Sequence, residues 1–285
     1  MSQKSSNKSK AEKSEIHHLV HRSGAMARPV KKPRKTKQQP GHRNKWSMLF
    51  ILPAWVLVSF VGSSLLLSAL ILLLGAFRFD LTTMMPPAAF DSVFAALTYL
   101  LAFTIAFGVP LLFGRGRVTL ETLGLTRLVS WMDIGLVPIG FIAYLVGAWA
   151  IVTGAIALFP GFAPDQMQNI GFTNITDQAG YLLAFTTLVV IAPIAEELLF
   201  RGYLYGKLRG HVPMYAAILM TSVLFALVHM QWNVGLNVFA LSIVMCGLRE
   251  ITGSIWAGIL LHMAKNAVAF YILFAGSGLL PGVGA

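Results

Sequence analysis

Long apolar segments follow one another through most of this chain, and they restrict what it can fold into. A helix needs about 20 predominantly apolar residues to cross a bilayer. Segments of this kind occur at about residues 47–77, 89–113, 131–159, from 178 onward, 212–230, 233–248 and 254–275. The sixth is the shortest. We therefore predict an all-α, polytopic transmembrane bundle of about seven to eight spans.

Composition supports a membrane protein. The chain is 56% hydrophobic and 12% charged, whereas soluble domains carry about 25% charged residues. No alternation of polar and apolar residues is long enough to predict a β-barrel, and no internal repeat is found.

The net charge of +11 comes entirely from the N-terminal tail. Residues 1–45 hold 13 of the 22 Lys and Arg and only two acids, while residues 46–285 hold nine residues of each sign. With so few apolar residues the tail cannot bury enough surface to fold, so we expect it to be disordered. It is either a solvated segment that sets topology or a binder of anionic lipids. We expect no nucleic-acid partner and no cleavable signal peptide.

The distribution of Lys and Arg predicts the orientation. Basic residues lie in the tail, between the second and third apolar segments, and after the fourth, whereas the 160–177 loop holds two Asp and no Lys or Arg. The N-terminus is therefore expected in the cytoplasm, and a bacterial plasma membrane is the expected location.

Three ionisable residues lie together near the end of the fourth apolar segment: Glu196, Glu197 and Arg201. Such a side chain costs roughly 3 kcal/mol at the centre of a membrane helix, so these groups usually pair, face a cavity or take part in chemistry. Glu197 and Arg201 are four residues apart and share a helix face, whereas Glu196 is rotated by about 100°. One carboxylate can thus be held by the guanidinium while the other serves as a general base. A structural ion pair at an interfacial helix end is the alternative.

Polar residues recur at one-turn spacing in two later apolar segments. His229 follows Phe225 by four residues, and Asn266 follows His262 by four residues. Singly, each can be a packing residue, since a hydrogen bond between membrane helices contributes about 0.6 kcal/mol on average. Three separate helices that bring polar groups into one half of the protein predict that these groups converge.

This convergence sets a condition on the fourth helix. At a rise of 1.5 Å per residue, His229 and His262 lie roughly 22 and 13 Å from the cytoplasmic ends of their helices, whereas Glu197 would lie near the inner surface if its helix ended there. We therefore predict that the fourth helix continues to about residue 208. We also place Glu196 and Arg201 in a water-filled cavity within the membrane.

The residues now named resemble the three motifs of the CPBP family. These are Glu-Glu-x-x-x-Arg at 196–201, Phe-x-x-x-His at 225–229 and His-x-x-x-Asn at 262–266, in that order. The family comprises type II CAAX prenyl endopeptidases and bacteriocin-processing or abortive-infection proteins. The resemblance covers about residues 178–275 and leaves the preceding spans and the tail unexplained.

The resemblance implies an intramembrane endopeptidase of the glutamate type. Glu196 would activate the attacking water with help from His229, while Glu197 and Arg201 would orient this base. His262 and Asn266 would stabilise the oxyanion, and Phe225 would shape the pocket. The substrate would be a membrane-associated protein or peptide, with prenylated or CAAX-like chains as one option.

The chain then divides into four parts. We predict a cytoplasmic tail over residues 1–45, N-terminal transmembrane helices over 46–177, the catalytic helix core over 178–275 and a C-terminal tail over 276–285.

A zinc-dependent membrane protease is an alternative. Two Glu and two His side chains can supply zinc ligands, although the chain has no His-Glu-x-x-His pair and Asn266 is a poor zinc ligand. The single cysteine, Cys246, allows no intramolecular disulfide and no thiolate cluster. We expect no required cofactor.

Two further classes remain open. A non-proteolytic immunity or scaffold protein could use the same helices to bind a partner, but it would not need buried carboxylates. A transporter could relay protons through paired acids, but the inverted repeats typical of many transporters are missing.

Overall fold

The structure is a computed structural model that describes residues 47–114, 117–164, 166, 171–172, 175 and 177–274. All of its regular secondary structure is helical. No strand occurs among these residues, so the prediction of an all-α fold is confirmed. The predicted basic tail and C-terminal tail lie outside the described residues.

The first half of the chain forms two long α-helices and one composite helix. Its elements are α2 (Met48–Ala76), the short 3₁₀ turn η2 (Leu81–Thr83), α3 (Pro87–Phe103), the π-helical η3 (Thr104–Gly108), α4 (Val109–Leu112), α5 (Leu120–Leu123) and α6 (Trp131–Leu158). The start of α6 is set by a capping box, in which Ser130 and Asp133 each bond the other's backbone N–H.

The second half carries the predicted site. It comprises α7 (Gln178–Phe185), η4 (Thr186–Ile191), α8 (Ala192–Glu197), η5 (Leu198–Tyr205), α9 (Gly206–Arg209), α10 (Met214–Leu227), α11 (Trp232–Thr252) and α12 (Trp256–Phe274). Segments α7 to α9 form one continuous helix of 32 residues, with π-helical turns at η4 and η5. The prediction that the fourth helix continues to about residue 208 is therefore confirmed.

Six helices are long and apolar enough to cross a membrane, counted over the described ranges. The fifth apolar segment, 212–230, forms α10, which has 14 residues and a length of about 21 Å. The sequence prediction named the sixth segment as the short one, and this was wrong, because that segment forms α11 with 21 residues. Polar residues at both ends of α11 lower the local hydropathy, so the apolar segment in the sequence is shorter than the helix.

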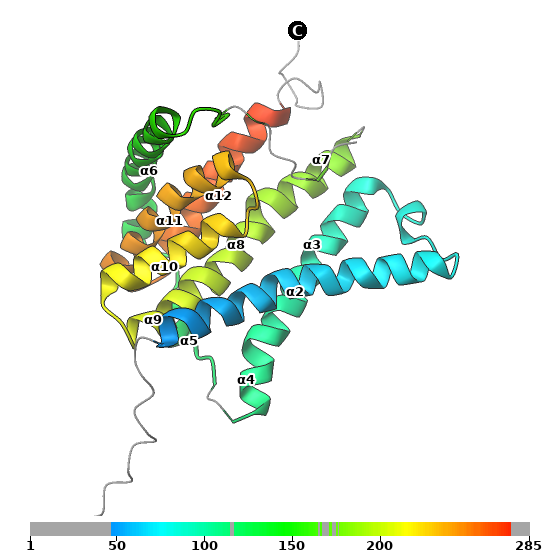
Figure 1. The fold of residues 1–285 in the computed structure, drawn as a ribbon, viewed down its shortest axis with the longest axis horizontal. Helices are drawn as coiled ribbons and strands as arrows, with labels where there is room; N and C mark the ends of the chain where they lie inside the picture. The colour runs from blue at the N-terminus through cyan, green and yellow to red at the C-terminus, as the bar shows by residue number, and fades with distance from the viewer. Residues whose placement is uncertain are drawn as a thin grey trace, which may run out of the picture. The chain divides into compact units, whose positions relative to one another are not determined.

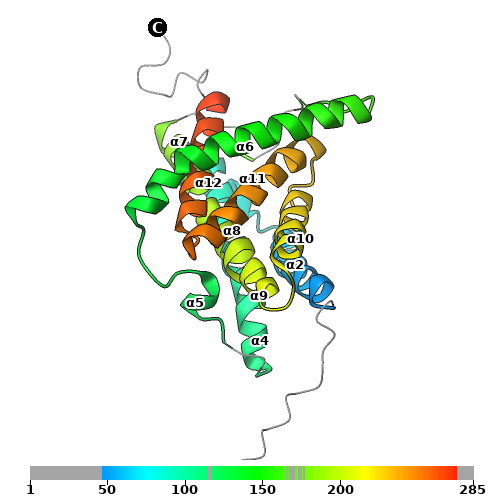
Figure 2. The same ribbon diagram turned by 90° about the vertical axis from the view of Figure 1, so that its left-hand side faces the viewer.

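The long α7–α9 helix lies in the middle of the helix assembly. Figure 1 shows α2 and α3 on one side of it and α6, α11 and α12 on the other. In Figure 2, α6 crosses in front of α11 and α12. The central position explains why every residue from Leu199 to Tyr205 is buried.

Large apolar side chains cover the outside of the helices. Leu72 and Trp149, for example, are 75% and 71% exposed. Soluble monomers rarely expose apolar patches of such extent, whereas lipid contact accounts for them. Together with the six long apolar helices, this makes the chain an integral membrane protein.

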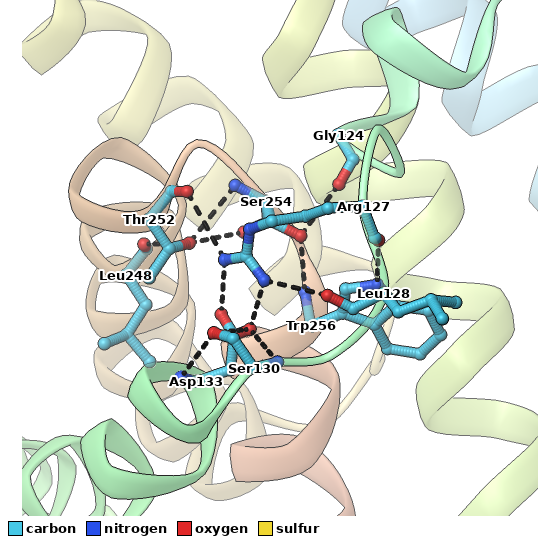
Figure 3. A network of polar contacts seen from close by, with 9 residues as sticks. All are labelled: Gly124, Arg127, Leu128, Ser130, Asp133, Leu248, Thr252, Ser254 and Trp256. Carbon is cyan, nitrogen blue, oxygen red and sulfur yellow. Dashed lines mark hydrogen bonds and ion pairs between the residues drawn. The ribbon is translucent and has the colours of Figure 1, made fainter.

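A polar network joins the start of α6 to the corner between α11 and α12 (Figure 3). Arg127 donates to both carboxylate oxygens of Asp133, at 2.5 and 2.9 Å. The Ser130 hydroxyl donates to Asp133 as well, at 2.7 Å. Asp133 is fully buried, and its hydrogen bonds with Arg127 raise the pKa of the guanidinium above its ordinary value.

The other half of this network holds the α11–α12 corner. Arg127 donates to the Thr252 carbonyl at 3.5 Å, and its own carbonyl accepts from the Trp256 indole at 2.8 Å. The Ser254 hydroxyl donates to the Gly124 carbonyl at 2.9 Å. The loop after α5 thus fixes the first turn of α12, the helix that carries His262.

Candidate active site

A buried ion pair forms the base of the site. Arg201 Nη1 donates to Glu197 Oε1 at 2.6 Å, and both side chains are fully buried. The pair spans one helical turn, as the spacing predicts. Removing one member of such a pair leaves an uncompensated buried charge, so the two side chains depend on each other.

Neighbouring helices enclose this pair closely. The Arg201 guanidinium carbon lies 4.1 Å from the centre of the Phe225 ring, in cation–π geometry. A Cβ built onto Gly258 of α12 would lie 3.1 Å from Glu197 Oε2. Glycine at this position therefore lets α12 approach the carboxylate.

The second carboxylate has a different environment. Glu196 is 16% exposed at its side chain, and its Oε1 accepts a hydrogen bond from the Tyr99 hydroxyl at 2.8 Å. Its Oε2 lies 3.8 Å from His262 Nε2, which is too long for a hydrogen bond. Glu196 is thus the carboxylate that has access to water.

His262 stands between the two carboxylates. Its Nδ1 lies 3.1 Å from Glu197 Oε1. With Glu197 ionised and held by Arg201, the carboxylate accepts only, so Nδ1 is the donor. The other ring nitrogen, Nε2, is then directed toward Glu196.

His229 reaches the site from the end of α10. The helix stops at Leu227, and His229 lies in the turn that follows, where Met230 adopts a φ of 57°. The expectation of a helical His229 was therefore wrong, because the helix ends two residues earlier. Its Nδ1 donates to the Phe225 carbonyl at 2.7 Å, because a carbonyl can only accept, and Nε2 remains the free ring nitrogen.

Phe225 packs against three side chains of this site. Its ring meets the His229 and His262 rings edge-on, with centroids 4.9 and 5.8 Å apart. Since it also lies under the Arg201 guanidinium, its ring is in contact with the ion pair and with both imidazoles.

Asn266 ties α12 to the long central helix. Its side-chain amide donates to the Leu188 carbonyl at 2.9 Å, within the π-helical segment η4. A π-helical turn shifts the backbone bonds from i+4 to i+5, and the amide hydrogen-bonds one carbonyl of this segment. Asn266 therefore makes the interhelical contact that membrane Asn residues often make, while it also borders the cavity described next.

A cavity of about 230 Å³ opens beside Glu196. Its polar lining consists of Tyr99, Glu196, His229, His262, Lys265 and Asn266. Its apolar lining consists of Leu188, Ala192, Val238, Ala269, Phe270 and Leu273. The cavity therefore combines ionisable groups with apolar walls.

The structure brings all six predicted residues together, but they have two different environments. Glu196, His229, His262 and Asn266 line the cavity, whereas Glu197 and Arg201 lie behind it. The expectation that Arg201 lies in the cavity was wrong, because Phe225 and the surrounding helices exclude it from water.

Sequence reasoning did not find two cavity residues, Tyr99 and Lys265. Lys265 offered a signal, since it is an ionisable residue in the middle of an apolar helix. Tyr99 offered none, because tyrosine is common in membrane helices and its partner lies 97 residues away.

The geometry also bears on the zinc alternative. Among the described residues, no three His, Cys, Asp or Glu side chains are grouped so that they could hold a metal ion. The two carboxylates and two imidazoles form hydrogen bonds with Tyr99, Arg201, one another and the backbone instead.

Comparison with known proteins gives a family for this arrangement. Residues 178–268 match the family described as Type II CAAX prenyl endopeptidase Rce1-like. The chain is 30% identical over 133 residues to the UPF0177 protein YxdF of Lactococcus lactis subsp. lactis (strain IL1403), which covers 47% of this chain and 67% of that protein. The chain belongs to the Rce1-like family. An uncharacterized 24.3 kDa protein of Escherichia coli is 28% identical over 137 residues, covering 45% of this chain and 62% of that protein. No solved structure matches the chain.

The Rce1-like match contains the whole predicted residue set, from Glu196 to Asn266. It begins at α7 and therefore leaves out α2, α3 and α6. Tyr99, which contacts Glu196 directly, lies outside the matched residues.

Proposed function

We propose that this chain is an intramembrane endopeptidase that hydrolyses membrane-associated proteins or peptides with water activated by Glu196. One observation carries the proposal most directly. Glu196 borders a cavity lined by two imidazoles, whereas the neighbouring Glu197 is fully buried and neutralised by Arg201. Membership of a family described as endopeptidases supports it.

Glu196 is the general base in this proposal. A water in the cavity gives a proton to the carboxylate, and its oxygen forms a bond to the carbonyl carbon of the scissile peptide. The C–N bond then breaks as Glu196 returns the proton to the leaving amine. His229 also lines the cavity, and its Nε2, the nitrogen that does not bond the Phe225 carbonyl, assists the proton transfer.

The oxyanion formed in this step needs donors. His262 and Asn266 project from one face of α12 into the cavity, and we assign them this task. Because Nδ1 of His262 already donates to Glu197, this role requires His262 to carry a proton on Nε2 as well. A single donor of this type contributes about 3–4 kcal/mol to transition-state stabilisation in other enzymes. Because the Asn266 amide also bonds Leu188, only its second N–H serves the oxyanion.

Glu197 and Arg201 orient the site from behind. Glu197 accepts from His262 Nδ1 and from Arg201, which fixes the imidazole that faces Glu196. The proposed chemistry uses these side chains alone and no metal ion.

The proposed substrate must reach the cavity from the membrane. The apolar lining by Leu188, Phe270 and Leu273 suits a lipid-linked or apolar peptide segment, and prenylated CAAX-like chains are one such class. Whether a prenyl group is required can be measured with paired peptides that differ only in that group.

We further propose a bacterial plasma membrane with a cytoplasmic N-terminus. Arg127 and Arg209 both contact the last turn of α11, which itself carries Arg249, so these basic residues gather at one end of the helices. This agrees with the bias expected for a cytoplasmic end. The basic tail would then face anionic lipids of the inner leaflet.

The decisive experiment replaces Glu196 with Gln. Wild type and Glu196→Gln are reconstituted into liposomes with solubilised membrane proteins of the host, and newly formed peptide termini are compared by mass spectrometry. Glu121→Gln serves as the matched control, because Glu121 lies exposed on α5. We expect termini that appear with wild type and the control and are lost in Glu196→Gln.

Identical termini in all three samples would remove the protease assignment and favour a binding role as scaffold or immunity protein. Metal content and activity after chelation are measured on the same preparation. Activity that is lost on chelation and restored by zinc would replace the glutamate mechanism by the zinc alternative.

A further inference from the structure

We propose that Tyr99 of α3 is a positioning residue of the site, whose hydroxyl fixes the Glu196 carboxylate toward the cavity. The inference rests on the proposed function for its catalytic consequence. Nothing in the family match points to Tyr99, which lies well before residue 178.

The contact is direct and its direction is defined. The Tyr99 hydroxyl lies 2.8 Å from Glu196 Oε1. An ionised carboxylate has no proton to give, so the hydroxyl donates. A hydrogen bond to a charged acceptor is about twice as strong as one between neutral groups. The partial burial of the Glu196 side chain strengthens it further.

Anchoring one oxygen determines what the other can do. A carboxylate without a fixed partner can rotate about its terminal bond. With Oε1 held by Tyr99, Oε2 is the oxygen that faces His262 Nε2 at 3.8 Å. Oε2 is therefore the atom placed to accept a proton from water.

Tyr99 is itself held in place by its surroundings. Its ring lies 5.8 Å from that of Phe60 on α2, and Phe60 packs edge-on against Phe200 of the central helix. A second polar contact joins α3 to the central helix, where the Thr187 hydroxyl donates to Ser92 at 3.0 Å. Ser92 and Tyr99 are two turns apart on α3, so one face of this helix follows the central helix.

The position of α3 explains why the contact matters. Figure 1 shows α3 and α12 on opposite sides of the long central helix. Glu196 on that helix thus receives His262 from one side and Tyr99 from the other. The site is completed by a helix from the first half of the chain, outside the matched residues.

Tyr99→Phe tests the proposal because it removes only the hydroxyl. Loss of one hydrogen bond to a charged group predicts a fall in kcat of about 10- to 100-fold, with KM within about twofold because the substrate contacts remain. Tyr144→Phe is the matched control. It removes a 2.6 Å interhelical hydrogen bond to Asn237. Neither Tyr144 nor Asn237 lines the cavity, so this variant should leave kcat within about twofold.

A thermal double-mutant cycle tests the contact without any activity. Tyr99→Phe should lower the melting temperature by about 2–4 °C in the wild-type background. In a Glu196→Ala background, where the acceptor is gone, the same change should have almost no effect. Equal shifts in both backgrounds would overturn the proposed contact.

The two readouts separate the possible failures. An unchanged kcat in Tyr99→Phe, or a raised KM with unchanged kcat, would overturn the positioning role while the protease assignment stands. A wild-type protein that cleaves nothing would remove the proposed function. The cycle would then still decide whether Tyr99 holds Glu196.

Discussion

Replacing Gly206 with alanine tests whether the central helix needs its close contact with α5. Gly206 begins α9, directly after the π-helical segment that carries Arg201. A Cβ added at Gly206 would lie 2.5 Å from the Thr122 carbonyl oxygen and 2.8 Å from Arg249 Nη2. The nearer atom is backbone, so it cannot be relieved by rotating a side chain.

The magnitude follows from what must move. Carbon atoms in contact prefer separations of about 3.5–4.0 Å, so α5 would have to retreat by about 1 Å. Overpacking of this kind costs about 1–3 kcal/mol. Arg249 would also be disturbed, because it donates to the carbonyls of Thr122 at 2.8 Å and Leu123 at 3.3 Å. Loss of one such charged hydrogen bond adds about 1.5–3 kcal/mol.

Alanine favours the helical state by about 1 kcal/mol relative to glycine, which offsets part of this cost. The expected net destabilisation of Gly206→Ala is therefore about 2–5 kcal/mol. Gly247→Ala is the matched control, because a Cβ at Gly247 in α11 meets nothing within 4 Å. That variant should be neutral or up to about 1 kcal/mol more stable.

Equilibrium unfolding in mixed micelles, followed by tryptophan fluorescence, gives both free energies. Peptide cleavage by the folded fraction shows whether the site is also disturbed. If Gly206→Ala unfolds at the same denaturant concentration as Gly247→Ala, the close approach of α5 is not required and the reasoning is refuted.

Three further outcomes are expected. Arg201→Met should lower the unfolding free energy by about 3–5 kcal/mol, and a second change, Glu197→Gln, should recover most of the loss; equal stability of the single and double variants would contradict mutual dependence of the pair. Asp133→Asn should lower the unfolding free energy by about 1–3 kcal/mol, because it weakens the paired hydrogen bonds with Arg127. Calorimetry measures this change, and an unchanged melting temperature would mean that the network in Figure 3 does not contribute to stability. Chelation should leave peptide cleavage unchanged, and stoichiometric zinc in active protein would argue against a metal-free mechanism.

The helical architecture was predictable because hydropathy reports directly on what a bilayer accepts. The predicted segments 47–77 and 131–159 agree with α2 and α6 to within a residue at each end. The length of α11 was not predictable in this way. Its first and last turns contain Asn233, Arg249 and Glu250, which hydropathy treats as the ends of an apolar segment although they remain in the helix.

The site was predictable only where its contacts repeat at helical spacing. Glu197 with Arg201 is such a case, and His229 with Phe225 nearly so, since the backbone carbonyl of Phe225 accepts from the imidazole even though the helix has ended. Tyr99 lies in another helix, and no local pattern encodes a hydrogen bond across 97 residues.

The difference between the two adjacent glutamates comes from packing and not from their spacing. A rotation of about 100° between neighbouring residues guarantees that Glu196 and Glu197 face different surroundings, but it does not say which of them meets water. That choice is made by α12 and α10, because Gly258 lets α12 close over Glu197 and Phe225 covers the paired Arg201. The carboxylate left facing the cavity is the one bonded to Tyr99, so three helices that approach from different directions decide which glutamate faces the cavity, where we propose that it acts as the base.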